Sequence, residues 1–170
     1  GALLALVPAS IFAWLVTQIG GVAHGHPIEQ STPWVEGLGL EFALRLDGLS
    51  MLFALLISGI GTLIILYTQG YFKGHPQQGR FLMYILAFMA SMLGVVLADH
   101  FLVLFIFWEL TSFTSYLLIG FNHEKESART AALQAMLVTV LGGLFLLAGV
   151  ILLAQATGTW QLSEVIHRGA

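Results

Sequence analysis

The chain has 170 residues, of which 58% are hydrophobic and only 9% are charged, and its mean hydropathy is +0.90. Soluble domains carry about 25% charged residues, so this composition excludes an ordinary soluble domain and favours a membrane protein. The net charge of -3 excludes a basic surface for nucleic acid, and the absence of cysteine excludes disulfide scaffolds, thiolate metal sites and iron–sulfur clusters.

Five apolar segments are long enough to cross a bilayer. A spanning helix needs about 20 apolar residues, because lipid cannot satisfy backbone N–H and C=O groups. The sequence therefore predicts an all-α, polytopic transmembrane helix bundle, and we treat residues 1–170 as a single membrane domain. The predicted spans are residues 2–23, 49–70, 81–97, 101–121 and 131–154.

The first span, residues 2–23, follows neither an initiator Met nor a basic leader, so it is interpreted as a membrane helix and not as a signal peptide. We expect the chain to be part of a longer protein. Residues 24–47 are polar and rich in Pro and Gly, which predicts an exposed loop. Within the loop, residues 38–47 alternate between apolar and polar side chains, so we expect a short extracellular β-hairpin or strand. Asp47 is a candidate N-cap for the second span.

The remaining polar segments are short. Residues 73–80 are expected to form a hydrophilic turn, and the third and fourth spans form a tight hairpin in which Asp99 caps the fourth helix. On the fifth span, Gly142 and Gly143, together with Gly149, predict a close helix contact. The last 16 residues, 155–170, have the pattern of an amphipathic tail.

Basic residues predict which side of the membrane each loop faces. Four of them lie on one side of the bundle: Lys73, Arg80, Lys125 and Arg129. Arg45 and Arg168 lie on the other side. Short loops rich in Lys and Arg stay in the cytoplasm, so residues 24–47 are predicted to lie outside the cell.

Glu109 is the one acidic or basic residue within the five predicted spans. It lies eight residues into the fourth span, about 12 Å along the helix and therefore near the middle of the membrane. A charge at that depth costs about 3 kcal/mol on insertion scales, and such residues usually serve ion or proton movement. We therefore predict that Glu109 transfers protons. The alternative is a buried, hydrogen-bonded glutamate that fixes helix packing.

Hydroxyl groups follow Glu109 along the same helix. Ser112 and Tyr116 lie three and seven residues further on, on one helix face, and predict a polar path toward the cytoplasmic end. Thr139 on the fifth span is a further candidate for this path. Ser and Thr in membrane helices also often bond to a carbonyl of the preceding turn or permit close packing, and the sequence is equally compatible with that role.

No cofactor or metal site is predicted. All six histidines lie in loops or at span ends, so none of them can form the pair that ligates a haem within a bilayer. His24 and His26 are close in sequence, but without further ligand spacing they are a weak metal signal. Phosphate-binding loops, nucleophile elbows and paired carboxylates are absent from the sequence, which argues against hydrolases and kinases and leaves ion transfer.

Three motifs resemble a known family. They are residues 46–53 (LDGLSMLF), 107–112 (FWELTS) and 115–121 (SYLLIGF). These motifs are similar to those of the antiporter-like membrane subunits shared by respiratory complex I and the Mrp-type multisubunit cation/proton antiporters. Residues 134–143 (QAMLVTVLGG) resemble the large A subunit of Mrp antiporters, because the complex I counterpart usually carries an Arg and an Asp around Val140 and Gly143.

The resemblance implies that Glu109 is the key glutamate of the family's fifth helix, which works with a lysine on a later, broken helix. It also implies partners, namely other Mrp subunits, H⁺, Na⁺ and the lipid bilayer, and a location in the plasma membrane of a prokaryote. We therefore expect a subunit that exchanges external protons for cytoplasmic sodium. Two alternatives remain: a proton-pumping subunit of a quinone-linked NADH dehydrogenase or membrane-bound hydrogenase, and a structural membrane scaffold.

Overall fold

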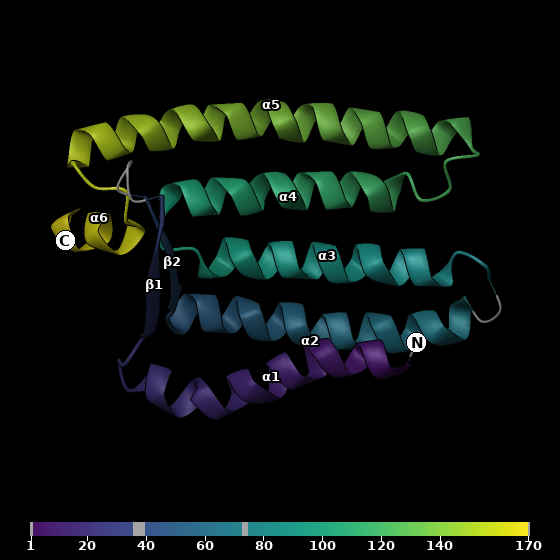
Figure 1. Ribbon diagram of the computed structural model, residues 1–170, viewed down its shortest axis with the longest axis horizontal. Coiled ribbons are helices and arrows are strands. Elements are labelled where there is room, and N and C mark those ends of the chain that lie inside the picture. Colours follow the sequence, from purple (N-terminus) through teal and green to yellow (C-terminus); the bar gives the residue numbers. More distant parts are fainter. Residues whose placement is uncertain (1, 36–39, 73–74, 170) are drawn as a thin grey trace.

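A computed structural model describes residues 2–35, 40–72 and 75–169. Five long helices lie side by side in chain order, each antiparallel to the next (Figure 1). A two-stranded hairpin and a short helix lie together at one end of this row, which we call the hairpin end. The elements are α1 Ala2–Ala23, β1 Ile28–Val35, β2 Leu40–Leu46, α2 Gly48–Tyr71, α3 Gln78–Leu97, α4 Phe101–Ile119, α5 Glu126–Thr157 and α6 Leu162–Gly169.

The five long helices are each long and apolar enough to cross a membrane, which confirms the predicted transmembrane bundle. Two of them begin at least three residues before the predicted spans. α5 starts at Glu126 and not at residue 131, and α3 starts at Gln78 and not at residue 81. The reason is physical: hydropathy marks the part of a helix that can lie in lipid, whereas the hydrogen-bonded helix continues into its polar flanks.

The segment after α1 contains two antiparallel strands, β1 and β2, in which Ile28 pairs with Leu46 and Thr32 with Phe42. The alternating pattern that predicted β2 begins at Leu38, which lies outside the described residues, as does Lys73 of the predicted turn. β2 ends directly before Asp47, whose side chain accepts hydrogen bonds from the N–H groups of Leu49 and Ser50. The predicted N-cap of α2 is therefore confirmed.

The turn between α3 and α4 is tied to both of its neighbours by backbone hydrogen bonds. On one side the Asp99 N–H donates to the Ala43 carbonyl of β2 over 2.9 Å. On the other side the Phe101 N–H donates to the Trp160 carbonyl over 3.0 Å, and the Leu162 N–H donates to the Asp99 carbonyl over 2.8 Å. The hairpin, the α3–α4 turn and α6 are thus joined into one hydrogen-bonded unit at the hairpin end.

Candidate functional site

The carboxyl group of Glu109 lies between α4 and α5. Its residue is half-buried, and one oxygen, Oε1, is fully buried and has no hydrogen-bond partner among the described residues. Arg45 forms ion pairs with Glu29 and Asp47, whereas Glu109 has no ion pair with a described residue. A buried carboxyl oxygen without a donor is costly in a folded protein, so this group requires a partner that the described helices do not supply.

Gly143 of α5 is the residue that faces this carboxyl group. A Cβ atom added at Gly143 would collide with Oε1 of Glu109 and would lie 3.1 Å from its Cδ and 3.6 Å from Cδ1 of Trp108. The predicted close helix contact is therefore confirmed at Gly143. At Gly142 and Gly149 an added Cβ has no described neighbour within 4 Å, so the close contact predicted there is not made by the described helices.

A groove of about 380 Å³ runs beside Glu109 between α4 and α5. Apart from Glu109, its lining is apolar: Phe105, Ile106, Leu110, Phe113, Met136 and Val140. The groove therefore leaves space for a further group beside the Glu109 carboxyl group.

Two of the three hydroxyl groups predicted to form a path, those of Ser112 and Thr139, are bonded within their own helices. Ser112 Oγ donates to the Trp108 carbonyl over 3.3 Å, and Thr139 Oγ1 donates to the carbonyls of Ala135 and Met136 over 2.9 and 3.1 Å. Tyr116 lines a different cavity, at the opposite end of α4 from the hairpin. These bonds are those of the alternative role in helix packing, although each oxygen can still accept a hydrogen bond from water.

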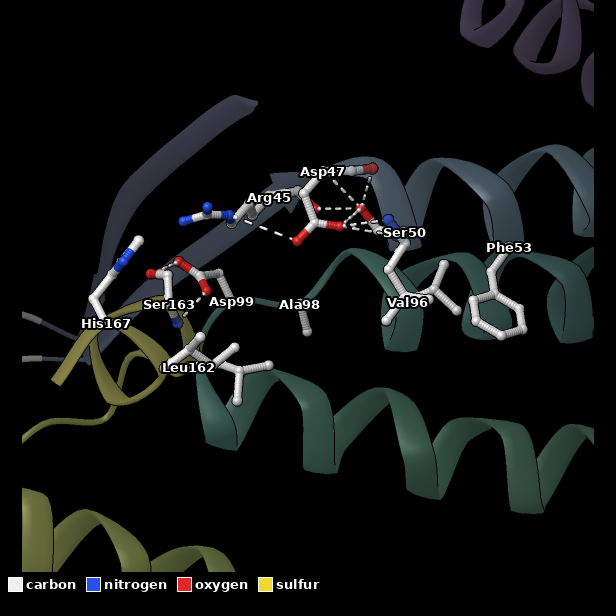
Figure 2. Close-up of a pocket in the computed structure, with 12 residues that line it drawn as sticks. Arg45, Asp47, Ser50, Phe53, Val96, Ala98, Asp99, Leu162, Ser163 and His167 are labelled. Carbon is white, nitrogen blue, oxygen red and sulfur yellow. Dashed lines mark hydrogen bonds and ion pairs between the residues drawn. The ribbon is translucent and has the colours of Figure 1, made fainter. Parts of the chain in front are cut away.

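Asp99 does not cap α4 as predicted. Its carboxylate accepts hydrogen bonds from the Ser163 N–H over 2.9 Å and from Ser163 Oγ over 2.7 Å, so it holds the start of α6 (Figure 2). The N-cap of α4 is His100, whose Nδ1 accepts from the Leu102 N–H over 3.2 Å. The prediction failed because the partner of Asp99 lies 64 residues further along the chain.

A cavity of about 370 Å³ opens at this position, between β2, α2 and α6. Asp47 and Asp99 both line it, and Figure 2 shows their carboxylates bonded to the residues that they cap. The pKa of Asp47 is lower than its ordinary value. Burial raises this pKa, but hydrogen bonds from Ser50 and Leu49 and the charge of Arg45 together outweigh the effect of burial. Both acids are therefore engaged in holding α2 and α6.

His100 gives this end of the molecule a pH-dependent stability. Burial lowers the pKa of His100 below its ordinary value of 6.5, against the opposing charges of Glu41 and Asp99. As the pH falls, the unfolded chain therefore takes up a proton at His100 at a higher pH than the folded chain does. The stability that is present above pH 6.5 is lost as the pH falls through the lowered pKa of His100 in the folded chain.

We expect thermal unfolding of the complete protein in detergent to show this loss between pH 8 and pH 5. His100→Asn, which keeps an N-cap acceptor without a titrating ring, should flatten the dependence. The exposed His75→Asn is the control and should leave the slope unchanged. An unaltered slope in His100→Asn would contradict the assignment.

Metal-binding clusters are not found among the residues that the structure describes: no group of three or more His, Asp or Glu side chains is placed to hold an ion. His24 lies in the turn directly after α1, His26 lies between this turn and β1, and both are exposed. Glu109 is therefore the candidate site that the described helices offer for ion transfer.

Comparison with known proteins places this arrangement in a family. Two family models match: NADH-ubiquinone oxidoreductase (complex I) chain 5 N-terminus over residues 34–82, and the NADH:quinone oxidoreductase/Mrp antiporter transmembrane family over residues 98–168. The chain is 43% identical over 164 residues to Na(+)/H(+) antiporter subunit A1 of Staphylococcus epidermidis, and 44% identical to that of Staphylococcus aureus. Each alignment covers 96% of this chain and 20% of the relative, so the chain spans about one fifth of the length of these relatives.

Solved structures agree with this result. The Mrp complex from Dietzia sp. DQ12-45-1b matches with a TM-score of 0.75 and 30% identity, over 96% of this chain and 20% of that chain. Respiratory complex I from Thermus thermophilus matches with a TM-score of 0.77 and 27% identity, over 98% of this chain and 34% of that one. The chain therefore belongs to the family of antiporter-like membrane subunits that Mrp-type Na⁺/H⁺ antiporters share with respiratory complex I.

Proposed function

We propose that this chain is part of the ion-translocating membrane subunit of a monovalent cation/proton antiporter, in the plasma membrane of a prokaryote. The intact subunit exchanges external protons for cytoplasmic sodium in a complex with other Mrp subunits. The observation that carries this proposal is the Glu109 carboxyl group, held in a membrane-spanning helix with one oxygen buried and without a hydrogen-bond partner among the described residues. The 43% identity to an antiporter subunit supports sodium as the exchanged cation.

In this proposal Glu109 alternates between a neutral acid and a carboxylate paired with a cationic side chain from the rest of the subunit. Opposite charges within about 4 to 6 Å favour the carboxylate by the equivalent of 1 to 3 pKa units, which is enough to move a proton on or off. The groove between α4 and α5 leaves Glu109 open to such a neighbour. Ser112, Tyr116 and Thr139 contribute hydroxyl oxygens to water molecules that connect Glu109 with the end of the bundle.

Proton pumping in a complex I-like enzyme is the second candidate, since both matching family models carry complex I in their descriptions. The Glu109–Gly143 contact favours the antiporter. An acidic residue at position 143, which resemblance to complex I implies nearby, would collide with the Glu109 carboxyl group. Glycine at position 143 thus leaves room for the Glu109 carboxyl group, whereas an acidic side chain at this position would not.

The test is reconstitution of the complete subunit with its partner subunits in sealed vesicles that contain a pH indicator. We expect a sodium pulse to move protons in the opposite direction at once, without an electron donor or a quinone. Potassium given at the same concentration measures selectivity. Proton movement that is independent of sodium and requires NADH or another electron donor would contradict this proposal and support the redox-driven alternative.

A further inference from the structure

A second cavity lies at the opposite end of the bundle from the hairpin, where α3, α4 and α5 meet. Its volume is about 200 Å³, and we call it the arginine pocket. The side chains that define it are Arg80, Tyr116, Leu117, His123, Arg129 and Leu133. The pocket thus combines two guanidinium groups with an apolar wall.

Neither guanidinium group has an acidic partner within the described residues. Arg80 Nε donates to the Tyr84 hydroxyl over 2.6 Å, and its guanidinium carbon lies 5.3 Å from the centre of the Tyr84 ring. Arg129 Nη1 donates to the His123 carbonyl over 3.2 Å. These contacts orient both side chains and leave most of their donors unused, because a guanidinium group carries five N–H bonds.

Both arginines also lie where a helix disfavours a cation. Arg80 is in the first turn of α3, which contains no acidic residue, and Arg129 is in the first turn of α5, which also contains Glu126. The capping residues Gln77 and Lys125 make no side-chain hydrogen bond to the free N–H groups. The dipole at a helix N-terminus repels arginine and attracts an anion, so an anion in the pocket would be stabilised by the guanidinium groups and by the N-terminus of α3, where no acidic side chain offsets the dipole.

The apolar wall of the pocket continues toward the middle of the membrane. Leu133 lines the pocket and is 52% exposed, and three leucines follow it along α5 with exposures of 56 to 70%: Leu137, Leu141 and Leu144. From Leu133 to Leu144 this ridge is about 16 Å long at 1.5 Å per residue. A ligand that fits both parts has an anionic head and a long apolar tail.

We propose that the arginine pocket binds the phosphate group of an anionic phospholipid whose acyl chain lies along the leucine ridge of α5. The charge of the pocket selects a net anionic headgroup over a zwitterionic one. The pocket lies at the end of the spans, which is the depth of the headgroups, and basic pockets between membrane helices recognise such lipids. This proposal does not depend on the proposed transport function.

The first experiment measures lipid binding to the complete complex by native mass spectrometry, with phosphatidylglycerol and phosphatidylcholine as probes. We expect Arg80→Gln and Arg129→Gln each to weaken phosphatidylglycerol binding about tenfold, in line with the loss of a charge-assisted hydrogen bond. The double variant should lose the preference for phosphatidylglycerol. Lys125→Gln removes one positive charge from the same end without touching the pocket, and it should bind as the unmodified complex does. Equal binding by all variants would overturn the proposal.

The second experiment needs no variant and therefore holds even where a substitution prevents assembly. Phosphatidylglycerol with a photoactivatable acyl chain should label α5 peptides that contain Leu133 and Leu137, whereas the corresponding phosphatidylcholine should not. Labelling of other helices but not of α5 would contradict the lipid site. Inorganic phosphate at 10 mM should not reduce this labelling, and loss of labelling would assign the pocket to free phosphate instead.

Discussion

Replacing Glu109 with Gln is expected to abolish sodium-dependent proton exchange, with a loss of at least about 100-fold in rate. Glutamine keeps the size of the side chain and can occupy the same place beside Gly143, but it cannot release a proton. Removal of a positioned proton-transfer group typically costs 10²- to 10⁴-fold. The measurement is the initial rate of proton movement after a sodium pulse, in vesicles that contain equal amounts of assembled complex.

The same variant separates transport from a purely structural role of Glu109. If the carboxyl group only fixes helix packing, Glu109→Gln lowers the yield or thermal stability of the complex and leaves the rate per complex unchanged. The matched control is Glu124→Gln, which neutralises an exposed carboxylate in the loop before α5 and should leave both quantities unaltered. Full exchange activity in an assembled Glu109→Gln complex would refute the assigned role.

Substitution of Gly143 by Ala should have the second largest effect, a loss of exchange of about tenfold or more. The added methyl group would occupy the place of Glu109 Oε1, so the carboxyl group must move or the two helices must separate. Displacement by about 1 Å can cost a factor of 100 where the geometry of a reacting group matters. The measurement is again the sodium-dependent rate per assembled complex.

Gly142→Ala provides the control for this substitution. The two glycines are adjacent on one helix, so both substitutions change the helix propensity equally. A Cβ at Gly142 has no described neighbour within 4 Å, so only Gly143→Ala disturbs the contact with Glu109. Glu109→Asp shortens the acid by one methylene group and should lessen the further effect of Gly143→Ala, because the clash is relieved. Equal rates for the two alanine variants would show that the Glu109–Gly143 contact is unimportant for transport.

The sequence predicted the membrane helices because each of them depends on a local property, the length of an apolar segment. The cap at Asp47 was predictable for the same reason, since the groups that it binds are two and three residues away. β1 was harder to predict from the sequence than the helices were. Its sequence, IEQSTPWV, contains Pro33 and four consecutive polar residues, and the strand forms because β2 pairs with it.

The candidate site was predicted only in part. Glu109 was identifiable from composition alone, because an acid in an apolar span requires an explanation. Its contact with Gly143 and the contact of Asp99 with Ser163 join residues that are 34 and 64 positions apart. No local pattern encodes such distances, so the pairing of helices had to be known before these contacts could be assigned.

The hydrogen bonds on both sides of the α3–α4 turn have a mechanical consequence for transport. They anchor α4 at Phe101, next to residues that are bonded to β2 and to the segment before α6. A rocking motion of α4 must therefore pivot at this anchored end and grow in amplitude along the helix. Glu109, about 12 Å from the pivot, would move by less than half as much as the far end near Ile119. A motion of α4 would thus open the far end of the bundle more widely than the region around Glu109, because the hydrogen bonds at the hairpin end hold the helix there.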